Sequence, residues 1–148
     1  MGIVPKFKAS DLDKIFKEAE KQMFEKVIRV LKYAGEIAIN EAKNNGAYQD
    51  QTANLRNSIG YVITVNGKVI NENFSLSAQG TEPSKENGLK IGRQLALSIA
   101  RQSKEISLVI VAGMKYAAYV ESRGYNVLTS AEQRANQLVP ELLRQLKV

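Results

Sequence analysis

Any chemistry in this chain must come from carboxylates, lysines or tyrosines, because the sequence contains neither histidine nor cysteine. Their absence excludes a Ser-His-Asp triad, a thiolate nucleophile and the commonest zinc ligands. Glu18 and Glu25 stand two helical turns apart, but Lys21 and Arg29 follow them at the three- and four-residue spacing of salt-bridged surface helices. We therefore expect no enzyme and no catalytic residues.

The glycines do not have the spacing of a phosphate-binding loop, since neither G-x-G-x-x-G nor G-x-x-x-x-G-K occurs in the sequence. No aspartate-rich segment has the spacing of a calcium loop. The sequence therefore predicts no cofactor and no metal site.

Length and composition indicate one globular domain spanning residues 1–148, with 44% hydrophobic and 24% charged residues. The net charge of +6 has two interpretations, a solvated surface or a small basic nucleic-acid-binding module. The N-terminus has no apolar core of a signal peptide, and no apolar run is long enough to span a bilayer, so we expect no membrane partner.

The first expected element is a long helix over residues 11–44, with Ser10 as its N-cap and Asn44-Asn45-Gly46 as its stop. Apolar residues recur along it in steps of three and four, which marks one helical face. Extra apolar positions widen this face. Either the whole face packs on the domain's own sheet, or part of it meets a neighbouring subunit.

The segment that follows predicts a β-hairpin, with strands over 59–65 and 68–74 joined by Asn66-Gly67. Residues 75–87 are small and polar, so we expect a flexible loop. A helix over 88–102, frayed at Gly92, and a buried strand over 105–112 come next. Residues 116–122 form a further strand or a short helical turn. Ser130 caps a C-terminal helix in which Pro140 predicts a kink or restart at Val139.

Two short phrases stand out within this α-β-β-α-β-α order. In the first, over 52–59, Thr52 is expected to cap a helical turn while Leu55 and Ile59 point inward. The second, over 116–124, has tyrosines whose apolar rings and polar tips suit a wall that is part core and part interface. Glu121 fits three roles: a surface carboxylate paired with an arginine, an inter-subunit salt bridge, or an acceptor for turn backbone.

Together the phrases resemble the head–tail junction and minor tail-component (tail completion) proteins of long-tailed bacteriophages. That family has a phrase close to Thr-Gly-Asn-Leu-Arg-x-Ser-Ile and, after a strand, Tyr-Ala-x-Tyr-Val-Glu-x-Gly. The matching residues here are Thr52, Asn54, Leu55, Arg56, Ser58, Ile59, Tyr116, Ala117, Tyr119, Val120 and Glu121. The family's glycine is replaced by Ala53, so the turn is not expected to need a positive φ. Ser122-Arg123-Gly124 replaces the commoner aromatic-Gly-Thr, so the following loop is expected to differ.

The resemblance implies an α+β fold in which the long N-terminal helix packs on a small antiparallel sheet, with a mid-chain helix and a C-terminal helix. It also implies a structural protein of a phage or prophage virion, made in the bacterial host cytoplasm. Such a protein assembles with itself into a ring, commonly a hexamer, and with other head–tail or tail proteins, and DNA passes through the ring lumen. The sheet and long helix would build the ring, while the 75–87 loop and the C-terminal helix would meet the adjacent layer.

Overall fold

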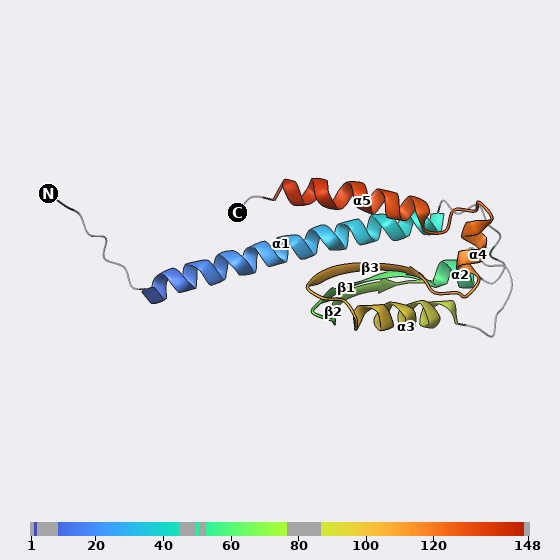
Figure 1. The fold of residues 1–148 in the computed structure, drawn as a ribbon, viewed down its shortest axis with the longest axis horizontal. Coiled ribbons are helices and arrows are strands. Elements are labelled where there is room, and N and C mark those ends of the chain that lie inside the picture. The colour runs from blue at the N-terminus through green and yellow to red at the C-terminus, as the bar shows by residue number, and fades with distance from the viewer. Residues whose placement is uncertain (1, 3–8, 45–49, 51–52, 77–86, 147–148) are drawn as a thin grey trace.

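The computed structural model describes residues 2, 9–44, 50, 53–76 and 87–146. The expected α+β architecture is confirmed, with a long N-terminal helix, a three-stranded antiparallel sheet, a mid-chain helix and a C-terminal helix (Figure 1). The elements are α1 Ala9–Asn44, α2 Asn54–Asn57, β1 Ile59–Val65, β2 Lys68–Phe74, α3 Gly88–Ala100, β3 Ile106–Ala112, α4 Ala117–Ser122 and α5 Thr129–Arg144.

The sheet has the order β2-β1-β3, and β1 pairs antiparallel with both neighbours. Asn66 and Gly67 both have positive φ, 50° and 83°, as a two-residue hairpin turn requires. The predicted hairpin is therefore confirmed with both of its strand boundaries. Every residue of β1 from 59 to 64 is buried, because helices cover both faces of this central strand.

Each face of the sheet has its own helical cover. Tyr61 and Ile63 belong to the larger core, which α1 and α5 complete, whereas Val62 packs against α3. The face of α3 that meets the sheet consists of small residues at every fourth position: Gly88, Gly92, Ala96 and Ala100.

The expected fraying of the mid-chain helix at Gly92 is wrong, since α3 is continuous and Gly92 is buried within it. A Cβ atom at Gly92 would lie 2.2 Å from the carbonyl oxygen of Ser58. Glycine is thus needed for close approach of the helix to the sheet, and the packing contacts outweigh its low helix propensity.

Only the second half of α1 is buried. Its buried positions all lie between residues 30 and 42: Val30, Leu31, Ala34, Gly35, Ala38, Ile39 and Ala42. The preceding part, which we call the arm and define as residues 9–25, projects away from the sheet (Figure 1). Ile15 and Phe16 on the arm are each 63% exposed.

Two sequence expectations about helix ends are wrong. Ser10 lies inside α1, which begins at Ala9, and Ser130 lies in the first turn of α5 instead of capping it. The cap of α5 comes from elsewhere, as described below. Of the kink or restart expected at Val139, the restart does not occur, because α5 continues through Pro140 for one further turn. Most of the expected 75–87 loop, residues 77–86, lies outside the described residues.

Candidate assembly interface

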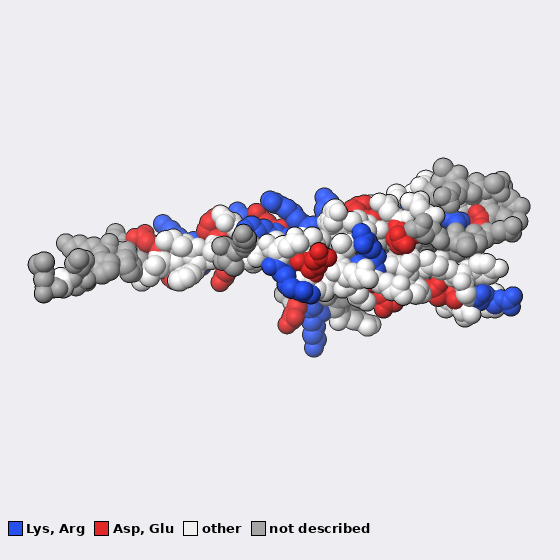
Figure 2. Space-filling view, turned by 90° about the horizontal axis from the view of Figure 1, so that it is seen from above, with Lys and Arg blue, Asp and Glu red and all other residues white. Residues whose placement is uncertain are grey.

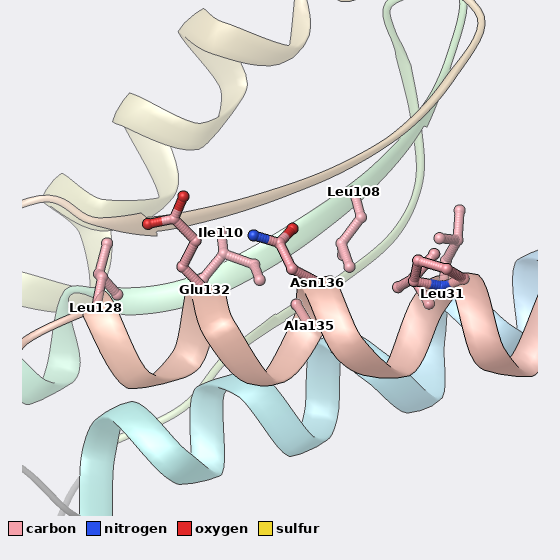
Figure 3. Close-up of a pocket in the computed structure, with 9 residues that line it drawn as sticks. Leu31, Leu108, Ile110, Leu128, Glu132, Ala135 and Asn136 are labelled. Carbon is pink, nitrogen blue, oxygen red and sulfur yellow. The ribbon is translucent and has the colours of Figure 1, made fainter.

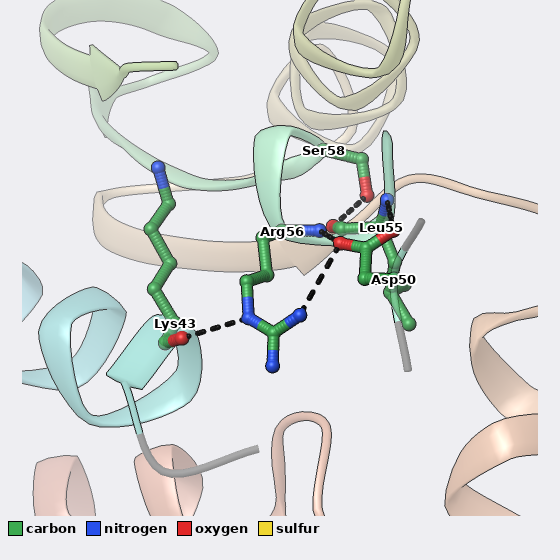
Figure 4. Close-up of polar contacts among 5 residues, drawn as sticks. All are labelled: Lys43, Asp50, Leu55, Arg56 and Ser58. Carbon is green, nitrogen blue, oxygen red and sulfur yellow. Dashed lines mark hydrogen bonds and ion pairs between the residues drawn. The ribbon is translucent and has the colours of Figure 1, made fainter. Parts of the chain in front are cut away.

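The first phrase begins with a capped turn whose cap is Asp50. One carboxylate oxygen of Asp50 accepts a hydrogen bond from the backbone N–H of Leu55 at 3.2 Å, and the other accepts from that of Arg56 at 2.8 Å (Figure 4). Thr52, the predicted cap, lies outside the described residues. Asp50 therefore satisfies two backbone donors at the start of α2, as helix caps do.

Ala53 corrects another expectation, because its φ of 61° places it in the left-handed region. An alanine in place of the family's glycine predicts that no positive φ is needed. The backbone N–H of Ala53 donates to the carbonyl of Asp50 at 3.0 Å, and the left-handed conformation directs the following residues so that the N–H groups of Leu55 and Arg56 meet the Asp50 carboxylate. The left-handed conformation costs an alanine about 1–2 kcal/mol, which the surrounding contacts offset.

Arg56 ties this turn to the end of α1. Its Nε donates to the carbonyl oxygen of Lys43 at 3.1 Å, and its guanidinium lies 3.6 Å from the Asp50 carboxylate (Figure 4). The two side chains are only 8% and 2% exposed. Because Lys43 lies in the last turn of α1, its carbonyl has no acceptor role within the helix, and Arg56 supplies the missing donor.

Asn54 and Ser58 carry the remaining links of the first phrase. Asn54 Oδ1 accepts from the backbone N–H of Gly88 at 3.1 Å, which fixes the start of α3. Ser58 Oγ donates to the carbonyl of Leu55 at 2.7 Å and accepts from the N–H of Gly113 at 3.0 Å. Asn54, Leu55, Arg56 and Ser58 are all buried, so these residues form the scaffold where α1, α3 and β3 meet.

A polar cluster that the sequence patterns do not predict connects the hairpin to α1 by hydrogen bonds. Tyr61 donates to the Glu36 carboxylate at 2.8 Å, and Asn73 Nδ2 donates to the same carboxylate at 2.9 and 3.0 Å. Burial, and then the hydrogen bond and charge of Glu36, raise the pKa of Tyr61. Nearby, burial lowers the pKa of Lys43, partly opposed by the charge of Glu36, and Lys43 Nζ donates to the carbonyl of Ser75 at 2.7 Å. In the sequence, the only indication of this cluster is the position of Glu36 on the buried side of α1.

The second phrase lies at the end of the molecule, directly after β3. Residues 117–122 form a short helix, α4, so the helical alternative was correct. Tyr116 and Tyr119 are 40% and 62% exposed, and the Arg123 guanidinium lies 5.9 Å from the centre of the Tyr119 ring. Val120 is half-buried against the larger core. Exposed tyrosines and an arginine on and beside one short helix have the composition of an interface.

Glu121 is the cap of α5. Its carboxylate accepts from the backbone N–H groups of Val127, Leu128 and Thr129 at 2.6, 3.1 and 2.8 Å, and from the Thr129 hydroxyl at 2.5 Å. Burial raises the pKa of this carboxyl, but the four hydrogen bonds outweigh it, so the pKa lies below its ordinary value. Of the three roles expected for Glu121, the structure confirms hydrogen bonding to turn backbone. The carboxylate also complements the positive end of the helix dipole.

An apolar groove of about 490 Å³ runs between α5 and the β3 edge of the sheet (Figure 3). Leu108 and Ile110 point into it from β3, and Ala135 lies opposite them on α5. Val139 of α5 also lines the groove. Glu132 and Asn136 are its polar residues. The groove exists because α5 packs on α1 and not directly on β3.

The two phrases thus meet in space but differ in role, since the first is buried scaffold and the second is partly exposed. The N–H of Met114, two residues before Tyr116, lies 3.4 Å from Ser58 Oγ and links them. Comparisons with protein-family models, curated proteins and solved structures give no match. None of the helices in the described ranges has the length and apolar character needed to cross a bilayer.

Proposed function

We propose that this chain is a non-enzymatic structural protein of a phage or prophage virion, a tail-completion or connector component of the head–tail junction or tail. It acts by assembling into a ring with its own copies and by contacting neighbouring virion proteins. The two phrases support the class of protein. The observation that carries the proposal is the arm of α1.

The arm exposes four large apolar side chains. Leu12, Ile15, Phe16 and Phe24 are 36%, 63%, 63% and 39% exposed. Burying side chains of this size contributes about 1.5–3 kcal/mol each, so an arm that leaves them in water favours a partner that covers them. The rest of α1 is anchored in the core, which holds the arm in position for such a partner.

The charges of the arm favour a protein partner over an anionic surface. Within the arm, three lysines are interspersed with five carboxylates: Asp11, Asp13, Glu18, Glu20 and Glu25. A helix that lies on a membrane or on nucleic acid carries an excess of lysine and arginine instead. Figure 2 likewise shows basic and acidic side chains interspersed over the face that it displays. This mixture favours a virion structural role over the alternative of a basic nucleic-acid-binding module.

The test compares two variants in particles released from cells that carry the gene. The arm variant combines Ile15→Gln and Phe16→Gln, and the matched control combines Lys14→Gln and Lys21→Gln, which lie seven residues apart on the side of the helix opposite Leu12. Both keep their melting temperatures, because all four side chains are exposed. Quantitative mass spectrometry of the purified particles should find wild type and control incorporated, and the arm variant reduced about tenfold or more, as expected for loss of buried apolar contacts.

Equal incorporation of the arm variant would contradict the role given to the arm. Absence of every version from the particles would contradict the virion assignment itself. In parallel, duplex DNA affinity across a salt series tests the alternative, because tight binding by the monomer with a steep salt dependence would favour the nucleic-acid-binding module.

A further inference from the structure

The free edge of the sheet at β3 lacks the features that normally protect an edge strand. Its seven residues, Ile-Ser-Leu-Val-Ile-Val-Ala, include no charge and no proline, and within the described part of the chain β3 pairs with β1 alone. Natural edge strands are usually shortened, charged, bulged or covered, because unpaired backbone groups are a template for another strand.

The opposite edge is protected. The pairing of β2 with β1 shifts register between Ile63 and Thr64, which is a β-bulge or a similar irregularity. β2 also carries Lys68 and Glu72, and the Glu72 carboxylate is 3.0 Å from Arg93 Nε on α3. The contrast between the two edges singles out β3 as the edge left open for pairing.

Two hydrogen bonds identify the backbone groups that β3 leaves open. The N–H of Gly113 donates to the carbonyl of Ser58 at 3.2 Å, and the N–H of Asn66 donates to the carbonyl of Glu105 at 2.8 Å. In an antiparallel ladder, hydrogen-bonded pairs alternate with non-hydrogen-bonded pairs. Odd-numbered residues of β3 therefore bond to β1, and the even-numbered residues turn their N–H and C=O groups outward: Ile106, Leu108, Ile110 and Ala112.

We propose that β3 pairs antiparallel with β3 of a second copy, across a two-fold axis at Val109, to form a continuous six-stranded sheet. Only this register pairs all four outward-facing residues, placing Ile106 opposite Ala112 and Leu108 opposite Ile110 of the other copy. No like charges meet across the pair, because β3 contains no charged residue. The pattern is thus complementary to itself, as a two-fold interface requires.

The groove beside β3 supports the same occupant. Leu108 and Ile110 point into it, so pairing brings two such rows together on one face of the joined sheet. The two grooves then merge into one apolar interior between the α5 helices of both copies. This contact closes at two copies and does not by itself build a ring, so it stands independently of the virion assignment.

A cysteine cross-link tests the register, because the chain has no cysteine of its own. Val109 would face its counterpart in a non-hydrogen-bonded pair, with Cα atoms about 4.5 Å apart, within disulfide range. Under mild oxidation, Val109→Cys should therefore form a disulfide-linked dimer. The matched control is Ser107→Cys, on the same side of the same strand. It would lie about 13 Å from its counterpart and should stay unlinked.

Sedimentation provides the second measurement. Leu108→Pro removes an outward N–H without removing a bond to β1, so it should keep the fold and weaken dimerisation at least about tenfold. The proposal is supported if Val109→Cys forms the disulfide-linked dimer while Ser107→Cys does not, and if Leu108→Pro weakens the dimer seen in sedimentation. Equal linking of the two cysteine variants, or a wild-type chain that stays monomeric while neither variant links, would overturn it.

Discussion

Replacing Glu121 with glutamine removes the charge that holds the start of α5 while keeping the shape of the side chain. The carboxylate accepts four hydrogen bonds, three from successive backbone N–H groups and one from the Thr129 hydroxyl. A hydrogen bond to a charged group contributes about 1.5–3 kcal/mol against about 1 for a neutral one, and the helix dipole adds roughly 0.3–1 kcal/mol. Since Glu121 is half-exposed, we take the lower end and expect a loss of about 1.5 kcal/mol.

The assay is denaturant unfolding of the two proteins at several pH values. Because folding lowers the pKa of Glu121, its contribution is fully present above the ordinary value of 4.5 and is lost as the pH falls through the folded-state pKa. The difference between wild type and Glu121→Gln should therefore be constant from neutral pH down to about 5 and shrink below 4.5. Glu132→Gln, in the first turn of the same helix, is the matched control and should cost only about 0.3–0.5 kcal/mol. Equal losses for both variants, or a difference that persists at pH 2, would refute the capping role.

Three further substitutions test the scaffold by the free energy of unfolding. Gly92→Ala should destabilise by about 3 kcal/mol or more, because its Cβ would meet the Ser58 carbonyl oxygen at 2.2 Å; an unchanged midpoint would contradict the close helix–sheet approach. Thr64→Val should stabilise by about 1 kcal/mol, since the fully buried Thr64 Oγ1 has no hydrogen-bond partner among the described residues; a loss of stability would point to a partner. Arg56→Met should cost about 3 kcal/mol by leaving Asp50 buried without its cation, and a cost below about 1 would show that the pair is dispensable.

Local patterns predicted the elements of this fold well. The Asn66-Gly67 turn and the alternation around it fixed both hairpin strands, because turn geometry and side-chain period are properties of neighbouring residues. The long helix was likewise visible from its period, and its stop at Asn44 was correct. The sequence does not predict how much of α1 its own sheet covers, because the covered length depends on where the sheet ends.

Three of the errors lie where a contact outside the local pattern decides a local structure. Gly92 was expected to weaken a helix, but the approach of Ser58 makes glycine necessary there. Ser130 was expected to cap α5, but Glu121 reaches its N-terminus from the preceding helix. Ala53 was expected to avoid a positive φ, but contacts made by Asp50 impose one. In each case a specific contact overrides a local preference, and the period and propensity of the surrounding residues do not predict that contact.

The virion assignment is tested most directly by quantitative mass spectrometry of purified particles released from cells that carry the gene, with and without its deletion. The proposed function predicts that this chain is present in intact particles at a few copies each, and that deletion leaves heads and tails unjoined or tails incomplete. Complete, infectious particles that lack the chain would contradict it.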